Sequence, residues 1–304
     1  MSDLNAHARD YLRLRRALGF KLERAGQLLP QLVAYLEAAG ATTVSADLAI
    51  AWAGLPDAQP NHLAQRLAIA RGFARYLQTI DPLTEVPPPG VFPKSRQRPT
   101  PYLWSERDVC RVLEAARALR PPLRAATHRA LFGLMAASGM RIGEILGLTR
   151  DDVDLAGGVI TIRVAKFDRS RLVPLHPTTT EALSRYAAER DQLCFRPRSP
   201  AFFLSSVGTS LHRSGVEKTL RKITLDLGLR TETVRPRAHD LRHSFAVETL
   251  IRWHRAGLSV DEHIGALSTY LGHVSPADTY WYLSASPELM ALAAERLERA
   301  GGGQ

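Results

Sequence analysis

The stretch from residue 238 to residue 282 holds the side chains that an attack on a phosphodiester requires. His239 and Arg242 lie three positions apart, His273 follows a glycine, and Tyr282 lies nine positions after His273. A guanidinium binds phosphate through two parallel hydrogen bonds and keeps its charge, so Arg242 can stabilise the charge that builds on the phosphate oxygens. A tyrosine, with a pKa of about 10, becomes a nucleophile when a neighbouring histidine takes or shares its proton. These residue types predict a site for phosphodiester exchange.

Two alternatives remain open within this stretch. Tyr280 and Tyr282 point in nearly opposite directions on a helix, so only one of them is expected to face the site. His239 and His243 have the spacing of a zinc-binding pair, but no third ligand is evident in the sequence. The residues between these histidines also differ from the metalloprotease pattern, so we expect neither a metal nor another cofactor.

Two further cations come from earlier in the chain. Arg141 lies in the run Ser-Gly-Met-Arg-Ile-Gly-Glu, and Glu144 is close enough along a helix to orient it. The β-branched run 159–164 predicts a strand, and residues 172–175 predict its partner in a hairpin. Lys166 would then lie at the end of the first strand, where its ammonium can protonate the departing sugar oxygen.

Helical periodicity and capping residues predict the elements that must position these side chains. The first part of the chain contains no strand pattern, and its predicted helices span residues 5–18, 23–39, 46–53 and 61–78. The later part predicts helices at 105–118, 123–137, 177–190, 218–227, 239–255 and 261–272, with two more that begin near 275 and 289. The expected fold class is mainly α with a small antiparallel β-sheet (α+β).

A proline-rich basic stretch at residues 82–101 separates the two parts, because such a sequence is stiff and extended. We therefore expect a helical domain at 1–81, a linker at 82–101, and a second domain at 102–304 that ends in a helix. Basic residues exceed acidic ones by 40 to 30, which favours a polyanionic partner. The side chains expected to contact DNA phosphates are Arg13, Arg16, Arg71, Arg75, Lys94, Arg96, Arg98, Arg169 and Arg171. The alternative is that they are solvated charges on ordinary helices and on a plain connector.

Composition limits the class of protein further. Hydrophobic residues make up 45% of the 304 residues, which is enough for a proper core. Cys110 and Cys194 have no metal-ligand spacing, and we expect both to be reduced thiols. No apolar run approaches the ~20 residues of a membrane span, and no signal peptide is evident. The expected location is the cytoplasm, in association with the nucleoid, and no membrane contact is expected.

Together these motifs resemble those of the tyrosine recombinases, also called the phage integrase family. The resemblance covers about residues 102–290, and it rests on the motifs quoted above occurring in this order and spacing. It implies that the residues around the scissile phosphate are Arg141, Lys166, His239, Arg242 and His273, with Tyr282 as the nucleophile. It also implies strand cleavage and rejoining through a 3′-phosphotyrosine ester, without metal or ATP. The helical first domain is similar in architecture to the DNA-clamping domain of this family.

The resemblance also carries expectations about assembly. It implies double-stranded DNA as the partner and a homotetramer on two paired sites, with the C-terminal helix, at 289–297, docking on a neighbouring protomer. The phrase Leu-Ser-Thr-Tyr-Leu-Gly-His-Val-Ser-Pro is most similar to recombinases carried by mobile elements. One departure is Phe167, where the family has glycine, and it leaves Arg169 as a rival for the role of Lys166. The alternative functions are a catalytically silent DNA-binding protein and a topoisomerase-like relaxing enzyme.

Overall fold

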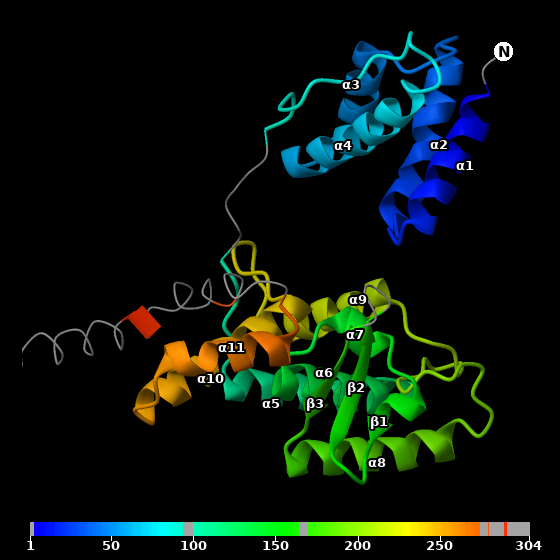
Figure 1. Ribbon diagram of the computed structural model, residues 1–304. Helices are drawn as coiled ribbons and strands as arrows, with labels where there is room; N and C mark the ends of the chain where they lie inside the picture. Colours follow the sequence, from blue (N-terminus) through cyan, green and yellow to red (C-terminus); the bar gives the residue numbers. More distant parts are fainter. Residues whose placement is uncertain (1–2, 94–99, 165–168, 274–278, 280–288, 291–304) are drawn as a thin grey trace, which may run out of the picture. The chain divides into compact units, whose positions relative to one another are not determined.

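A computed structural model describes residues 3–93, 100–164, 169–273, 279 and 289–290, with side chains described for all of these except 164 and 169 (Figure 1). The chain divides into two compact units, residues 1–99 and 100–304, which we call the N-terminal and C-terminal units. Within the described residues, no helix is both long and apolar enough to cross a membrane.

The N-terminal unit is helical throughout its described part. Ser45 caps α3 by accepting a hydrogen bond from the Leu48 N–H at 3.3 Å. Pro60 occupies the first turn of α4, where a backbone N–H is not needed. The core of the unit includes Trp52 and Phe73, both fully buried. The helix bounds agree with the predicted ones to within one residue: α1 (Leu4–Ala17), α2 (Glu23–Ala38), α3 (Ala46–Gly54) and α4 (Pro60–Leu77).

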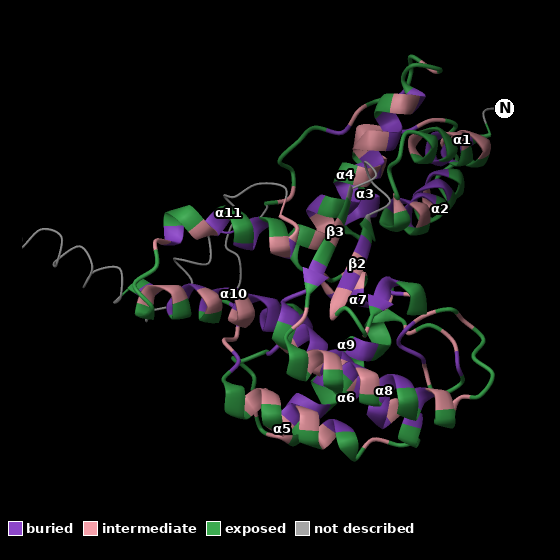
Figure 2. Cartoon of the chain, turned by 60° about the horizontal axis from the view of Figure 1, so that its bottom comes forward, coloured by how far each residue is buried: buried purple, intermediate pink, exposed green. Residues whose placement is uncertain are grey.

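The C-terminal unit is built around α6, which packs against α5, α8 and α10. Figure 2 shows buried residues along one side of α5 and of α8 and exposed residues along the other, as expected for amphipathic helices. The described elements of this unit are α5 (Glu106–Arg117), α6 (Pro122–Ser138), α7 (Ile142–Leu146), the 3-10 helix η1 (Arg150–Asp152), β1 (Val153–Asp154), β2 (Val159–Val164), β3 (Arg169–Pro174), α8 (Pro177–Leu193), α9 (Arg213–Asp226), α10 (Ala238–Arg255) and α11 (Val260–Leu271).

The sheet has the order β1-β2-β3, and both pairs of neighbouring strands are antiparallel. Ile160 pairs with Val173, and all three of Ile160, Ile162 and Val173 are buried in the core of the unit. Arg171 pairs with Ile162. Directly opposite residues of an antiparallel pair share a face, so Arg171 lies on the inner face of the sheet.

The structure differs from the sequence expectation at several elements of the described chain, including α8, which continues three residues past its predicted end at residue 190. Helix α9 begins at Arg213, five residues before the predicted start, because Ser214 and Gly215 are weak helix formers that hide its first turn. Strand β3 begins at Arg169, three residues before the predicted start, because pairing with β2 extends through its polar end. Strand β1 was not predicted. The predicted fold class, mainly α with a small antiparallel sheet, is confirmed.

Candidate active site

The candidate site is built around the C-terminal end of α11. The Gly272 N–H donates to the Thr269 carbonyl, and the His273 N–H donates to the Ser268 carbonyl, each at 2.9 Å. This is a Schellman ending, in which the residue after the helix adopts the left-handed conformation. Gly272 has φ of 68°, which glycine adopts without the steric cost of a Cβ. The ending turns the chain so that His273 follows directly beyond the helix.

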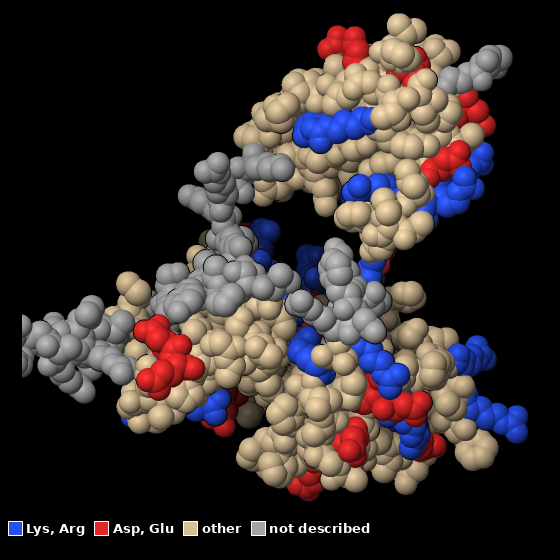
Figure 3. Space-filling view, viewed as in Figure 1, with Lys and Arg blue, Asp and Glu red and all other residues tan. Residues whose placement is uncertain are grey.

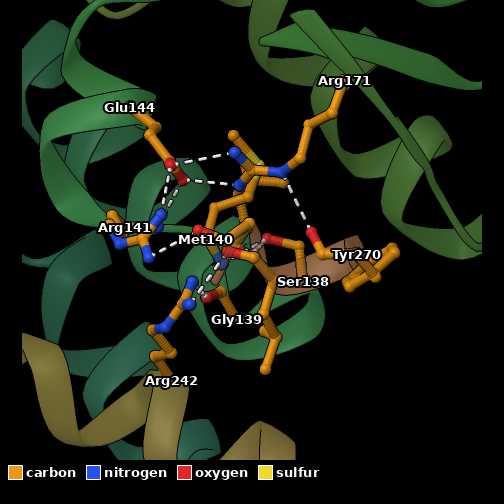
Figure 4. Close-up of polar contacts among 11 residues, drawn as sticks. Ser138, Gly139, Met140, Arg141, Glu144, Arg171, Arg242 and Tyr270 are labelled. Carbon is orange, nitrogen blue, oxygen red and sulfur yellow. Dashed lines mark hydrogen bonds and ion pairs between the residues drawn. The ribbon is translucent and has the colours of Figure 1, made fainter. Parts of the chain in front are cut away.

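Three consecutive carbonyls at this helix end each accept a hydrogen bond from a different arginine. Helix C-termini leave unsatisfied carbonyls that carry partial negative charge, so they attract guanidinium groups. The contacts run from Arg171 Nε to the Tyr270 oxygen (3.0 Å), from Arg242 Nη2 to the Leu271 oxygen (2.9 Å) and from Arg141 Nη2 to the Gly272 oxygen (2.7 Å). We call these three side chains the arginine centre; Figure 4 shows them with their partners.

Arg242 comes from the first turns of α10 and is 2% exposed. Its Nη1 donates to the Gly139 carbonyl at 2.9 Å, so the guanidinium joins the end of α6 to the end of α11. Gly139 has φ of 60°, and a Cβ there would lie 2.6 Å from the Phe245 ring. Both helix ends that hold Arg242 therefore require glycine.

Arg141 is the N-cap residue of α7, and Glu144 lies in the first turn of that helix. The Glu144 carboxylate accepts from the Arg141 backbone N–H and from its Nη1, each at 2.9 Å. The Arg141 side chain is 40% exposed. The predicted contact between Arg141 and Glu144 is present. It forms at the N-terminal cap of α7 and not between two side chains on one face of a helix. Arg141 is held on one side and remains accessible to a phosphate on the other.

The Glu144 carboxylate is ionised by its surroundings. Burial by itself would raise its pKa, but hydrogen bonds from Arg171 and Arg141 outweigh burial, and the pKa lies below its ordinary value. Glu144 therefore stays charged at neutral pH and can orient cationic side chains.

His239 and Arg242 lie on the first turns of α10, as the sequence predicts. Asp240 fixes the start of this helix, because it accepts hydrogen bonds from the backbone N–H and the guanidinium of Arg237. The pKa of His239 is lowered by loss of surrounding water and by the positive charge of Arg242. A neutral His239 can accept a proton at neutral pH.

His243 lies one turn further along α10 and packs edge-on against His239, with the ring centres 4.7 Å apart. Burial, and then the neighbouring His239, lower the pKa of His243 to about 4. Within the described residues, no group of three or more histidine, cysteine, aspartate or glutamate side chains is arranged to hold a metal ion.

His273 lies next to the carbonyl that holds Arg141, and its Nδ1 is 2.6 Å from the hydroxyl of the buried Thr279. This contact orients the ring. Lys166 and both candidate nucleophiles, Tyr280 and Tyr282, lie outside the described residues. The structure thus brings together Arg141, Arg242 and His273 around one helix end, with His239 one turn from Arg242. The predicted roles of Lys166 and of the tyrosine nucleophile stay predictions.

The residues predicted to contact DNA are placed in different ways. Arg13, Arg16 and Arg75 are exposed on the N-terminal unit, and Arg13 forms an ion pair with Asp10 at 2.8 Å. Figure 3 shows basic side chains on the surface of both units, with acidic side chains among them. Lys94, Arg96, Arg98 and the side chain of Arg169 lie outside the described part of the chain.

Two others of these residues, Arg71 and Arg171, also have partners within the chain. Arg71 donates from Nε to the Pro87 carbonyl (2.8 Å) and from Nη2 to the Pro88 carbonyl (2.7 Å), so it fastens the proline-rich stretch to α4. Arg171 is 13% exposed and pairs with Glu144, which differs from the DNA-contacting position expected for it. In the structure β3 extends back to Arg169, and Arg171 faces inward because it lies two residues from the buried Val173. The predicted strand began at residue 172 and left Arg171 in the turn before it.

Comparison with known proteins identifies the family. The sequence model of the Phage integrase family matches residues 105–288. Putative integrase/recombinase y4rB of Sinorhizobium fredii is 44% identical over 308 residues, covering 98% of this chain and 98% of that protein. Tyrosine recombinase XerD of Lacticaseibacillus casei is 30% identical over 233 residues, covering 74% of this chain and 73% of that protein.

Solved structures agree with this match at the level of the fold. XerA recombinase aligns with a TM-score of 0.53 at 19% identity, covering 99% of this chain and 100% of its own. The Tn1549 transposon integrase in complex with a circular intermediate DNA aligns with a TM-score of 0.61 at 17% identity, covering 96% of this chain and 99% of its own. With a family match over most of the C-terminal unit and a relative that aligns along nearly the whole chain, this protein belongs to the phage integrase family of tyrosine-type site-specific recombinases.

Proposed function

We propose that this protein recombines two DNA sites by cleaving and rejoining strands through a 3′-phosphotyrosine ester on Tyr282, without metal or ATP. The observation that carries the proposal is the arginine centre. Arg141 and Arg242 are fixed by backbone carbonyls and by Glu144, so their donors are oriented before substrate binds. Donors that are oriented in advance stabilise charge in a transition state without reorganising during the reaction.

In the cleavage step, the Tyr282 oxygen attacks the phosphorus and forms a new phosphate ester. The bond from phosphorus to the 5′ oxygen breaks, and the 5′ oxygen leaves as a hydroxyl. Neutral His239 takes the phenol proton, and Lys166 supplies a proton to the leaving oxygen. Arg141, Arg242 and His273 stabilise the charge on the other phosphate oxygens. Arg169 is the alternative donor in place of Lys166.

In the rejoining step, a 5′ hydroxyl from the partner strand attacks the phosphotyrosine and releases the tyrosine. One ester bond forms for each one that breaks, so no external energy source is needed.

The proposed substrate is double-stranded DNA, held by basic side chains of the N-terminal unit and of the linker. The DNA-bound Tn1549 transposon integrase and a XerH recombinase bound to its difH substrate have related folds, which supports this choice. We place the protein in the cytoplasm, on the nucleoid, as a homotetramer on two paired sites.

The proposed protomer contact uses the segment from 289 onward. Its first residue, Leu289, is buried in the apolar cluster of α10 and α11 in its own chain, while Met290 is 59% exposed. Residues from 291 onward lie outside the described part of the chain. Removal of residues 291–304 is expected to abolish strand exchange while single-site DNA binding persists.

A two-site plasmid assay tests the proposed function. Plasmids carry two copies of DNA from the flanks of the encoding gene, and the expected products are deletion or inversion of the segment between the copies. Relaxation of supercoils without strand exchange would instead identify a topoisomerase-like enzyme. Tight sequence-specific binding without any strand breakage would identify a catalytically silent DNA-binding protein.

A further inference from the structure

Glu144 shares its carboxylate between two arginines. Oε1 accepts from Arg141 Nη1 at 2.9 Å and from Arg171 Nη1 at 3.0 Å. Oε2 accepts from the Arg141 backbone N–H at 2.9 Å and from Arg171 Nη2 at 2.8 Å. Figure 4 shows both guanidinium groups directed at this carboxylate. Each oxygen thus has one bond from each arginine, and the carboxylate cannot rotate without breaking bonds to both.

Arg171 is better fixed than Arg141. Its side chain is 13% exposed, that of Glu144 is 14% exposed, and the two form parallel hydrogen bonds. Such paired bonds between a guanidinium and a carboxylate define direction as well as distance. The Nε of Arg171 also donates to the Tyr270 carbonyl, so the guanidinium is held from two sides.

Gly272 packs directly against the Arg171 guanidinium. A Cβ added at Gly272 would lie 2.5 Å from Arg171 Nη1 and 2.7 Å from its Cζ. The glycine therefore permits both the left-handed turn before His273 and the close packing of Arg171 against the backbone. Arg171 connects β3, α7 and the end of α11 at a single point.

We infer that Arg171 is a positioning residue of the strand-cleavage reaction, which acts by holding Glu144 in the orientation that directs Arg141 at the phosphate. The inference rests on the proposed function for its reaction. Arg171 itself does not touch the phosphate. This positioning role takes the place of the DNA contact that the charge of Arg171 and its place on a hairpin predict.

The geometry requires an arginine at this position. A lysine ammonium can reach one carboxylate oxygen but cannot bond both oxygens and the Tyr270 carbonyl in one plane. Without Arg171, Glu144 keeps only its bonds to Arg141, and only the Gly272 carbonyl still restrains the Arg141 guanidinium from outside the pair. A displacement of about 1 Å at a group that binds the transition state can cost on the order of 100-fold in rate.

The experiment compares Arg171→Met and Arg171→Lys with the native full-length chain. Single-turnover formation of the covalent protein–DNA adduct is measured at saturating DNA on a nicked substrate. We expect about a 100-fold lower rate for Arg171→Met, partial recovery for Arg171→Lys, and unchanged DNA affinity and salt dependence. The control is Arg163→Met, which removes an exposed arginine on β2 of the same hairpin that pairs with Asp152 of η1 at 2.8 Å. We expect this control to cleave at the native rate.

A second readout does not depend on activity. Titration of the Glu144 carboxylate is followed by NMR in protein with ¹³C-labelled glutamate, and the signal is assigned with Glu144→Gln. In Arg171→Met, burial still raises the pKa while fewer hydrogen bonds oppose it, so the Glu144 pKa rises. The adduct rate relative to native then falls further as the pH is lowered toward the raised Glu144 pKa of the variant.

The outcomes separate the inference from the function on which it rests. Weaker DNA binding with a smaller salt dependence and a native cleavage rate at saturation would make Arg171 a DNA contact and overturn the inference. An unchanged Glu144 titration in Arg171→Met would also overturn it. Absence of any adduct from the native chain would refute the proposed function, and the carboxylate titration would still decide whether Arg171 holds Glu144.

Discussion

Substitution of Gly272 by alanine tests whether the end of α11 organises the site. Gly272→Ala adds a Cβ at a residue with φ of 68° and 2.5 Å from Arg171 Nη1. Gly257 offers a matched control at the end of α10, because it has φ of 71° and a Cβ there meets nothing within 4 Å. Both helices end in the same pattern of backbone hydrogen bonds. Both substitutions therefore strain a left-handed residue, and Gly272→Ala in addition places its Cβ against Arg171.

The expected costs follow from these contacts. The left-handed conformation costs an alanine about 1–2 kcal/mol, and this is the whole cost expected for Gly257→Ala. Gly272→Ala must also displace Arg171 from a largely buried ion pair, and losing one partner of such a pair costs about 3–5 kcal/mol. Arg141 remains as a second partner of Glu144, so the lower end of that range applies. We expect about 4–5 kcal/mol in total for Gly272→Ala.

Native-state hydrogen exchange measures these costs locally. The free energy of opening is compared for peptides from β3 and α11 and for peptides from the N-terminal unit, which serve as an internal reference. Gly272→Ala should lower protection in β3 as well as in α11, and adduct formation should fall on the order of 100-fold. Equal loss of protection in Gly272→Ala and Gly257→Ala would refute the claim that Arg171 packing depends on this glycine.

Three further predictions concern single residues. The folded chain keeps His243 neutral down to its pKa of about 4, whereas an unfolded histidine titrates at 6.5. The unfolded state therefore binds the extra proton as the pH falls from 6.5 to 4, and the free energy of unfolding should fall by up to about 3 kcal/mol, a loss that His243→Asn removes. Arg75→Gln should lower the slope of log affinity against log salt by about 1 if Arg75 binds a phosphate, and an unchanged slope would exclude that contact. Lys166→Ala should slow cleavage by about 100-fold or more on ordinary DNA but little on DNA with a bridging 5′ sulfur, because that leaving group needs no proton. The same pattern in Arg169→Ala instead would transfer the role to Arg169.

The helices and the chemical motifs followed from the sequence because local signals specify them. Ser45, Pro60 and Gly272 mark helix ends through capping and backbone conformation, which depend on neighbouring residues only. The pair His239 and Arg242 could be placed at a helix start for the same reason.

The arginine centre did not follow from the sequence. Its acceptors are the backbone carbonyls of Tyr270, Leu271 and Gly272, and every residue type carries such a carbonyl. Only the tertiary approach of β3, α7 and α10 to the end of α11 selects these three. The predicted strand begins at residue 172, so Arg171 was expected in the preceding hairpin turn, where a charged side chain is exposed.

The alternation of β3 in the structure explains the inward position of Arg171. Leu172 is 65% exposed and Val173 is buried, so the face that carries Arg171 is the inner one. A buried arginine needs a carboxylate, and Glu144 belongs to the motif already singled out for Arg141. The structure pairs Arg171 with Glu144, where the sequence predicted a DNA contact.

The most direct test of the central claim is to map the covalent bond between protein and DNA. The native chain is trapped on a nicked suicide substrate from the flanks of its gene, the DNA is digested, and the modified peptide is identified by mass spectrometry. We predict a nucleotide attached through a 3′ phosphate to Tyr282, with the adduct lost in Tyr282→Phe and kept in Tyr280→Phe. A nucleotide on Tyr280, or an adduct that survives Tyr282→Phe, would contradict the assignment of the nucleophile.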